Sequence, residues 1–503
     1  MTDPSTGASN DAPDATAQRR HDLETLERGP WDVVIVGGGI VGVGALLDAT
    51  SRGMRAALVE QDDIAAGTSS RSSRLIHGGL RYLEQLRFGL VREALAERRR
   101  LLTLAPHLVR IESLLFPIYG IPFASKAFYD AGLTLYDVLG ARHDGGWHGR
   151  LSRGATLELA PTLRGDGLRG GLLYHDGVED DARYTLAVAR TALAGGAHIV
   201  TRARATGLRS GADGAIESIQ VADTTDGSML DVPTRSILDA TGVWAADPDR
   251  PFGGGTMRIL PSRGAHLVVR RDRIPNRTGL TIRVPGKIVF LVPWPDYWLI
   301  GTTDAPYEGS LDRPAAAGWE VDRLLSTVNA TMEVDLTRDD VVGTYAGLRP
   351  LIAPSGGSTV KASREHRVTV EPSGVVRIGG GKYTTYRVMA RDAIDAVLGK
   401  DVARRRPSET AERRLVGAAD LDELARSLDD VLARRTRLAQ ELPDRGAAVA
   451  PRVARILAAE LGWDDRRTAV EIEAYLASAR HEFSVAPPDP APAVERLATA
   501  GAD

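Results

Sequence analysis

Residues 32–42, Asp32-Val33-Val34-Ile35-Val36-Gly37-Gly38-Gly39-Ile40-Val41-Gly42, decide the fold that this sequence predicts. The β-branched run before Gly37 is typical of a buried parallel strand. The glycines at positions 37, 39 and 42 fit the pattern G-x-G-x-x-G. Gly37 permits a tight turn, Gly39 lets a diphosphate approach the backbone, and Gly42 lets the following helix pack closely on the strand. The segment therefore predicts a strand, a turn and a helix whose N-terminus stabilises a diphosphate.

A second short strand is expected from Arg55 to Glu60, and it ends in an acid. Glu60 lies 18 residues beyond Gly42, where a carboxylate can accept hydrogen bonds from ribose hydroxyls. The same carboxylate would repel a 2′-phosphate, which disfavours NADP. Strand, helix and strand together predict a βαβ unit in an open, mostly parallel sheet that binds a dinucleotide.

Three further segments favour FAD over NAD as that dinucleotide. Residues 67–73 form a hydroxyl-rich stretch suited to phosphates and ribityl hydroxyls. Residues 239–242 end a predicted strand in a glycine turn, and residues 378–382 end another and open a helix. That helix start can stabilise negative charge on the pyrimidine side of a reduced flavin. Segments so far apart suit a long, extended FAD, whereas a self-contained NAD domain would not need them.

These segments supply the residues predicted to bind the cofactor. They are Gly37, Gly39, Ile40, Gly42, Glu60, Gln61, Thr68, Ser69, Ser70, Ser73, Ala205, Thr241, Gly242, Gly379, Gly381 and Thr384.

The predicted fold class is α/β: a Rossmann-like FAD-binding domain interleaved with an antiparallel-sheet substrate domain, plus an all-α C-terminal domain. Short alternating runs between residues 170 and 304 favour strands, whereas helical spacing dominates after residue 400. Residues 84–104 predict a helix with an arginine-rich face, and residues 114–136 are interpreted as an insertion. The expected division is a disordered tail at 1–28, the interleaved domains at 29–398, with the substrate part mainly at 107–160 and 255–345, a helical domain at 399–484 and a tail at 485–503.

Composition excludes several other classes of protein and of site. The net charge of −3 over 503 residues gives no electrostatic reason to expect a nucleic-acid partner. With no cysteine, disulfides, iron–sulfur clusters and a cysteine-linked flavin are excluded. The histidines are scattered without ligand spacing, so no metal site is expected. Neither a secretory signal nor an apolar run long enough to span a membrane is present, which favours a cytoplasmic location.

An ordered set of motifs gives the sequence a family resemblance. The longest is Ser72-Ser73-Arg74-Leu75-Ile76-His77-Gly78-Gly79-Leu80-Arg81-Tyr82-Leu83-Glu84, and others follow at 105–108, 180–183, 301–304, 347–351, 380–387 and 430–436. Together they resemble the FAD-dependent glycerol-3-phosphate dehydrogenases, of the D-amino-acid oxidase and glycine oxidase superfamily. Lysine is usual in that family where this chain has Arg74, and common at Arg263, so the resemblance leads us to expect different local hydrogen bonding near the flavin. Residues 142–150 have no counterpart, and no role is assigned to them.

The resemblance implies oxidation of sn-glycerol 3-phosphate to dihydroxyacetone phosphate by hydride transfer to FAD, with electrons passed to a quinone. Arg81 and Arg349 are the predicted phosphate clamp, because guanidinium forks match phosphate oxygens. His77 is predicted to accept the hydroxyl proton or to hydrogen-bond the flavin. Lys382 is predicted to stabilise the anionic reduced flavin or to bind substrate.

The resemblance also implies a peripheral protein on the inner face of the cell membrane, and a homodimer is a further expectation. The arginines at 98–100 and the aromatic residues from Phe116 to Phe128 are the predicted contact with anionic lipid. Two other functions remain open. One is an FAD oxidase that makes hydrogen peroxide from glycerol 3-phosphate or an amino acid, and the other is a non-redox module that binds a dinucleotide.

Overall fold

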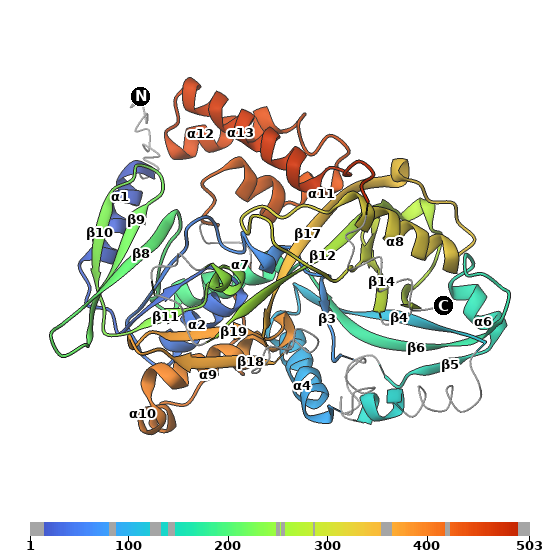
Figure 1. Cartoon of the computed structure of the whole chain (residues 1–503), viewed down its shortest axis with the longest axis horizontal. Helices are drawn as coiled ribbons and strands as arrows, with labels where there is room; N and C mark the ends of the chain where they lie inside the picture. Colours follow the sequence, from blue (N-terminus) through green and yellow to red (C-terminus); the bar gives the residue numbers. More distant parts are fainter. Residues whose placement is uncertain are drawn as a thin grey trace, which may run out of the picture.

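A computed structural model describes residues 15–79, 87–120, 132–138, 146–247, 252, 257–284, 287–353, 365–417 and 423–490. Three sheets with their helices, and a helical C-terminal domain, make up the described part of the chain (Figure 1). Arg81 and most of the predicted aromatic contact, residues 121–131, lie outside the described residues.

The first sheet has six strands in the order β18-β19-β11-β1-β2-β7, and all neighbours except β18 and β19 run parallel. The strands are β1 (Val33–Val36), β2 (Ala56–Val59), β7 (His198–Val200), β11 (Ile237–Asp239), β18 (His366–Val370) and β19 (Val376–Gly380). The alternation of side chains along β1 places Val33 and Ile35 in one core and Val34 and Val36 in another. Both faces are therefore buried, as the apolar run of β1 predicts.

Helices cover one face of this sheet. Helix α2 (Ile40–Ser51) packs against both α7 (Asp181–Ala194) and α9 (Tyr386–Leu398). The other face packs against a three-stranded antiparallel sheet of β8 (Ala203–Ser210), β9 (Ile216–Asp223) and β10 (Met229–Pro233). The Rossmann-like prediction is confirmed.

The expectation of a disordered segment over residues 1–28 is wrong for residues 15–27, which form helix α1 (Ala15–Glu27). Leu26 is fully buried beside the β8-β9-β10 sheet, and Arg19 donates hydrogen bonds to the carbonyls of Thr201 and Arg202. This helix has no clear sequence pattern, because its apolar residues are few and the carbonyl groups that anchor it lie about 180 residues away.

The second sheet has ten strands and is antiparallel except where β13 runs parallel to β4. Its main order is β16-β12-β15-β14-β13-β4-β6-β3, while β17 pairs with β12 and β5 pairs with β6. The strands are β3 (Leu75–Ile76), β4 (Val109–Tyr119), β5 (Gly149–Leu151), β6 (Leu168–Glu179), β12 (Ile259–Arg270), β13 (Gly279–Val284), β14 (Lys287–Trp294), β15 (Tyr297–Gly301), β16 (Ala305–Pro306) and β17 (Val341–Ile352). Helices α6 (Arg153–Leu159) and α8 (Gly318–Thr331) accompany it, and α8 contacts β12. The predicted antiparallel domain is confirmed, with β3, β6 and the end of β17 lying outside the ranges expected for it.

The structure corrects two sequence-based predictions for the segment before β6. The interpretation of residues 114–136 as an insertion is wrong for residues 114–119, which lie within the strand β4. Leu114, Leu115 and Phe116 are buried there, so the apolar residues of this segment belong to the sheet. The predicted arginine-rich helix is present as α4 (Phe88–Leu104), but Arg98 is only 4% exposed and pairs with the buried Asp176. Neither Arg98 nor Phe116 can therefore belong to a lipid-facing surface.

The C-terminal domain is helical, as predicted. It contains the π-helix η7 (Asp430–Arg435), α11 (Leu438–Glu441), α12 (Ala450–Leu461) and α13 (Asp465–Phe483), whereas α10 (Lys400–Arg405) packs beside α9 (Figure 1). Residues 485–490, predicted as tail, instead contact α8, where the carboxylate of Asp489 accepts a hydrogen bond from Trp319 N. Across the described ranges, no helix has both the length and the apolar character needed to cross a membrane.

Candidate functional site

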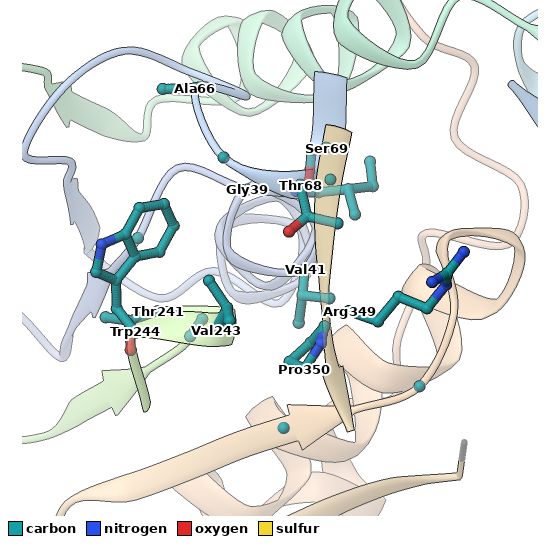
Figure 2. Close-up of a pocket in the computed structure, with 18 of the residues that line it drawn as sticks. Gly39, Val41, Ala66, Thr68, Ser69, Thr241, Val243, Trp244, Arg349 and Pro350 are labelled. Atoms are coloured by element: carbon teal, nitrogen blue, oxygen red, sulfur yellow. The ribbon is translucent and has the colours of Figure 1, made fainter. Parts of the chain in front are cut away.

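A cavity of about 710 Å³ lies at the carboxyl ends of the parallel strands, where it also meets β12 and β17 of the second sheet. Ligand sites in open α/β sheets form at this edge, where successive strands end in loops. Figure 2 shows Gly39 of the glycine turn, Thr68 and Ser69 of the serine-rich loop, Trp244 and Arg349 around this cavity. The two sheets therefore contribute to a single site.

The glycine turn has the tight geometry that its sequence predicts. Gly37 has a φ of +111°, and a Cβ there would lie 2.8 Å from Ala240 O. A Cβ on Gly42 would lie 1.9 Å from Gly37 O, so only glycine lets α2 approach the turn so closely. Ser69 Oγ accepts a hydrogen bond from Ile40 N at 2.9 Å, which ties the serine-rich loop to the start of α2. The N-terminus of α2 thus faces the cavity as a site for a diphosphate.

Glu60, the acid predicted to bind ribose hydroxyls, follows β2 and contacts the glycine turn. Its Oε2 accepts from Gly38 N at 2.6 Å, and its Oε1 accepts from Asp62 N at 2.8 Å. Burial raises the pKa of this carboxyl to about 7, opposed by the Gly38 hydrogen bond and assisted by the neighbouring charge of Asp63. The glycine turn thus holds the carboxyl of Glu60 through Gly38 N, and the sequence predicts this carboxyl as an acceptor for ribose hydroxyls.

The raised pKa of Glu60 predicts a pH-dependent stability for the protein freed of FAD. A raised carboxyl pKa stabilises the fold fully below the unfolded value, near 4.5, and this contribution disappears as the pH rises through about 7. We expect the melting temperature of the wild type to fall relative to Glu60→Gln between pH 5 and pH 8. Melting curves of both apoproteins across that range provide the test. If the two proteins keep a constant difference, the carboxyl of Glu60 titrates normally.

The substrate domain contributes Arg349, which lies on β17 beside β12. Its Nη2 donates to Thr302 Oγ1 at 3.0 Å and to Thr303 O at 3.2 Å, while Nη1 donates to Asp304 Oδ1 at 3.3 Å. A Cβ on Gly264 would lie 2.4 Å from Nη2, so the guanidinium passes directly over this glycine. The side chain remains 26% exposed and lines the cavity. The guanidinium of Arg349, which stays protonated and is held in one orientation, therefore lies where an anionic ligand in the cavity can bind it.

His266 also lines the cavity, and sequence reasoning did not find it. It is 3% exposed, it stacks on Tyr345 with 4.7 Å between ring centroids, and its Nε2 lies 2.8 Å from Ser73 Oγ. Burial, aided by the charges of Arg349 and Arg74, lowers the pKa of His266 to about 3. The ring is therefore neutral at physiological pH. In the sequence this histidine lies within an apolar strand, where it resembles an ordinary core residue.

Most of the predicted site residues meet at this cavity. Those that line it are His77, Arg349, Lys382, Gly37, Gly39, Ile40, Glu60, Gln61, Thr68, Ser69, Ser73, Ala205, Thr241, Gly242, Gly379, Gly381 and Thr384. Gly42 lies beneath the turn and Ser70 points its hydroxyl back to Gly67 O, so neither lines the cavity. Trp244, which donates to Asp312 at 2.9 Å, is a wall residue that the sequence pattern did not reveal.

The described groups fit FAD. The glycine cradle excludes even a methyl group, Glu60 stands at the ribose end, and the wall continues through Thr241 to the glycine turn before Lys382. These segments, far apart in the sequence, line one cavity, as the prediction of an extended FAD requires. Among the residues that the structure describes, no cluster of His, Asp or Glu could hold a metal ion.

Comparisons with known proteins agree with this geometry. A family model described as FAD dependent oxidoreductase matches residues 32–387, and one described as the C-terminal domain of alpha-glycerophosphate oxidase matches residues 387–468. The glycerol-3-phosphate dehydrogenase of Mycobacterium leprae is 39% identical, with 94% of this chain and 92% of the relative covered. Glycerol-3-phosphate dehydrogenase 2 of Mycobacterium tuberculosis has the same identity and coverage.

Solved structures show the same fold. The glycerol-3-phosphate dehydrogenase of Bacillus halodurans, complexed with FAD, has a TM-score of 0.76 at 24% identity, covering 94% of this chain and 99% of that one. The L-alpha-glycerophosphate oxidase of Mycoplasma pneumoniae, with FAD bound, has a TM-score of 0.57 at 18% identity, covering 73% and 94%. The chain is therefore an FAD-dependent oxidoreductase and belongs to the FAD-dependent glycerol-3-phosphate dehydrogenases.

Proposed function

We propose that the protein oxidises sn-glycerol 3-phosphate to dihydroxyacetone phosphate and passes the electrons to a quinone. The observation that carries this proposal is the presence of Arg349, Lys382 and two histidines on the same cavity as the glycine turn. A phosphate clamp, a proton acceptor and a flavin site are the three requirements of this oxidation. The 39% identity to glycerol-3-phosphate dehydrogenases over nearly the whole chain supports the choice of substrate.

Arg349 is the proposed clamp for the substrate phosphate. Its contacts with Thr302 and Asp304 fix the direction of the guanidinium, so little side-chain entropy is lost when a phosphate binds. Arg81, the second predicted clamp residue, lies outside the described residues and remains a prediction. Lys382 stands at the glycine turn after β19 and is proposed to stabilise negative charge at the flavin end of the site.

His266 is the proposed acceptor of the C2 hydroxyl proton, at Nε2, the atom near Ser73 Oγ. The charge of Arg349 is one cause of its low pKa, and a bound phosphate dianion offsets that charge. Binding of substrate would therefore make His266 a better proton acceptor. His77, predicted for this role, lines the same cavity and remains the second imidazole there. FAD, when bound, supplies the acceptor for the C2 hydride.

The proposal extends to the electron acceptor and the cellular setting. A quinone acceptor, contact with the inner face of the cell membrane and a homodimer rest on the family resemblance alone. The match to an alpha-glycerophosphate oxidase C-terminal domain favours a second candidate, an oxidase that reduces oxygen to hydrogen peroxide.

One steady-state experiment tests both the substrate and the acceptor. Purified, FAD-loaded protein is given sn-glycerol 3-phosphate, glycerol or glycine in air, with and without a water-soluble quinone analogue. Of the three substrates, we expect only sn-glycerol 3-phosphate to be oxidised. With the quinone analogue present, nearly one quinone should be reduced per substrate molecule oxidised, and little peroxide should form. Peroxide formed in step with substrate, whether or not quinone is present, would establish the oxidase instead. Turnover with glycine in place of the phosphate ester would contradict the substrate assignment.

A further inference from the structure

The serine-rich loop, residues 67–74, forms one wall of the FAD cavity. Its Ser69 bonds the start of α2 through Ile40 N, and its Ser73 contacts His266. Thr68 Oγ1 donates to Leu348 O at 2.6 Å, which joins the loop to β17 one residue before Arg349. A shift of this loop would therefore disturb the diphosphate end and the substrate end of the cavity together.

Arg437 of the C-terminal domain also holds this loop. Its Nη1 donates to Ser70 O at 3.0 Å, and its Nη2 donates to Asp180 Oδ1 at 2.6 Å. The same Nη2 forms a short hydrogen bond with Asp181, whose second oxygen accepts from Ser72 N at 2.8 Å. One side chain thus fixes the loop directly at Ser70 and, through Asp181, again at Ser72.

This contact is built from buried charges, unlike an ordinary surface ion pair. Arg437 is 2% exposed and Asp181 is fully buried. Burial on its own would raise the pKa of Asp180, but the Arg437 guanidinium holds it below its ordinary value. Removing one partner of a buried ion pair leaves an uncompensated charge, which costs far more free energy than breaking an exposed pair. Arg437 is therefore held firmly between its acceptors.

Two further contacts join the same domain to the same loop. Arg71 Nη2 forms a short ion pair with Glu482 of α13, and Arg74 Nη2 donates to Gln440 Oε1 of α11 at 2.5 Å. Loop residues 70, 71, 72 and 74 are therefore all held by the C-terminal domain or by the aspartate that Arg437 orients. Among the described residues of this domain, none lines the cavity, and the loop is one of the segments through which the domain can act on the site.

We propose that Arg437 is a positioning residue through which the helical C-terminal domain sets the affinity for FAD and the environment of the bound flavin. Arg437 has no catalytic role in this proposal, because it contacts the loop and not the cavity. The proposal rests on the FAD site and holds whichever substrate or electron acceptor the enzyme uses.

The test compares FAD binding to the apoproteins of wild type, Arg437→Gln and Arg437→Lys. We expect the dissociation constant for FAD, from quenching of flavin fluorescence, to rise at least about tenfold in Arg437→Gln, since a buried charged hydrogen-bond donor is lost. Arg437→Lys keeps the charge but not the fork, so its dissociation constant should lie between the two. The visible circular dichroism and the midpoint potential of the remaining bound flavin should shift in the same order.

A matched control separates positioning from loss of stability. Leu457 is a buried residue of α12, a helix that contacts α13 and α1. Leu457→Ala should lower the melting temperature of the apoprotein and leave the dissociation constant for FAD and the flavin potential unchanged. The exposed Arg455→Gln should change none of these quantities.

Equal FAD affinity and equal flavin spectra in Arg437→Gln and Leu457→Ala would overturn the proposal. If Arg437→Gln does not fold, Asp181→Asn tests the same path, because it weakens the link to Ser72 and keeps Arg437 in place. A dissociation constant unchanged in Asp181→Asn and in Arg437→Lys would then overturn it. A shifted FAD affinity in a protein that fails to oxidise sn-glycerol 3-phosphate would support the role of Arg437 and contradict only the proposed substrate.

Discussion

Replacing Arg349 by methionine is expected to lower kcat/KM for sn-glycerol 3-phosphate by roughly 10²- to 10³-fold while the protein stays yellow with bound FAD. The estimate follows from losing one member of a charge pair in a partly enclosed site, which costs about 3–4 kcal/mol. Thr302 and Asp304 would remain, but neither can replace the cation. The measurement is steady-state dye reduction, with flavin absorbance recorded for each preparation.

The specificity of the Arg349 effect distinguishes a clamp from a structural arginine. Glycerol lacks the phosphate, so any slow oxidation of glycerol should be nearly unchanged in Arg349→Met, and the preference for the phosphate ester should collapse. Arg270→Met removes an exposed arginine from β12, the partner strand of β17, and should leave both rates unchanged. A similar loss of rate with glycerol and with sn-glycerol 3-phosphate would show that Arg349 does not bind the phosphate.

The second large effect is expected at Gly42, where even alanine should abolish tight FAD binding. Its added Cβ would lie 1.9 Å from the carbonyl oxygen of Gly37, and backbone on both sides must move to relieve the contact. The turn would then no longer present its N–H groups to a diphosphate. We expect the dissociation constant for FAD to rise by about 100-fold or more, equivalent to about 3 kcal/mol.

Gly89 provides the matched control for this substitution. It lies in α4, and a Cβ there would meet no atom within 4 Å. Gly89→Ala should therefore bind FAD as the wild type does and be slightly more stable, because alanine is the better helix former. Equal flavin content in Gly42→Ala and the wild type would mean that the close approach of α2 to the turn is not required for FAD binding.

The nucleotide half of the site was predictable because its signals are local. The run from Val33 to Gly42 encodes the strand, the turn and the helix start within a few residues, and the structure places Glu60 against the same turn. Gly379 and Gly381, far along the chain, reach the same cavity because β19 is parallel to β11 and ends at the same edge. The rule that parallel strands end at one edge was enough to bring them together.

The features that sequence reasoning missed depend on contacts between distant segments. His266 resembles a core residue until the fold sets it opposite Ser73, nearly 200 residues away. Arg98 looks like a solvated helix arginine, but the buried carboxylate of Asp176 draws it into the core. Helix α1 is likewise fixed by carbonyl groups of the β7–β8 connection rather than by its own sequence pattern. Such pairings leave no periodic signal in a single sequence.

Anaerobic rapid mixing of the FAD-loaded protein with sn-glycerol 3-phosphate is the most direct test of the proposed activity. We expect the absorbance of oxidised flavin to disappear at a rate that saturates with substrate, and one dihydroxyacetone phosphate to form per flavin reduced. Glycerol at the same concentrations should give little bleaching, while dithionite should bleach the flavin fully. A flavin that dithionite reduces but that stays oxidised with saturating sn-glycerol 3-phosphate would show that the protein does not oxidise this substrate.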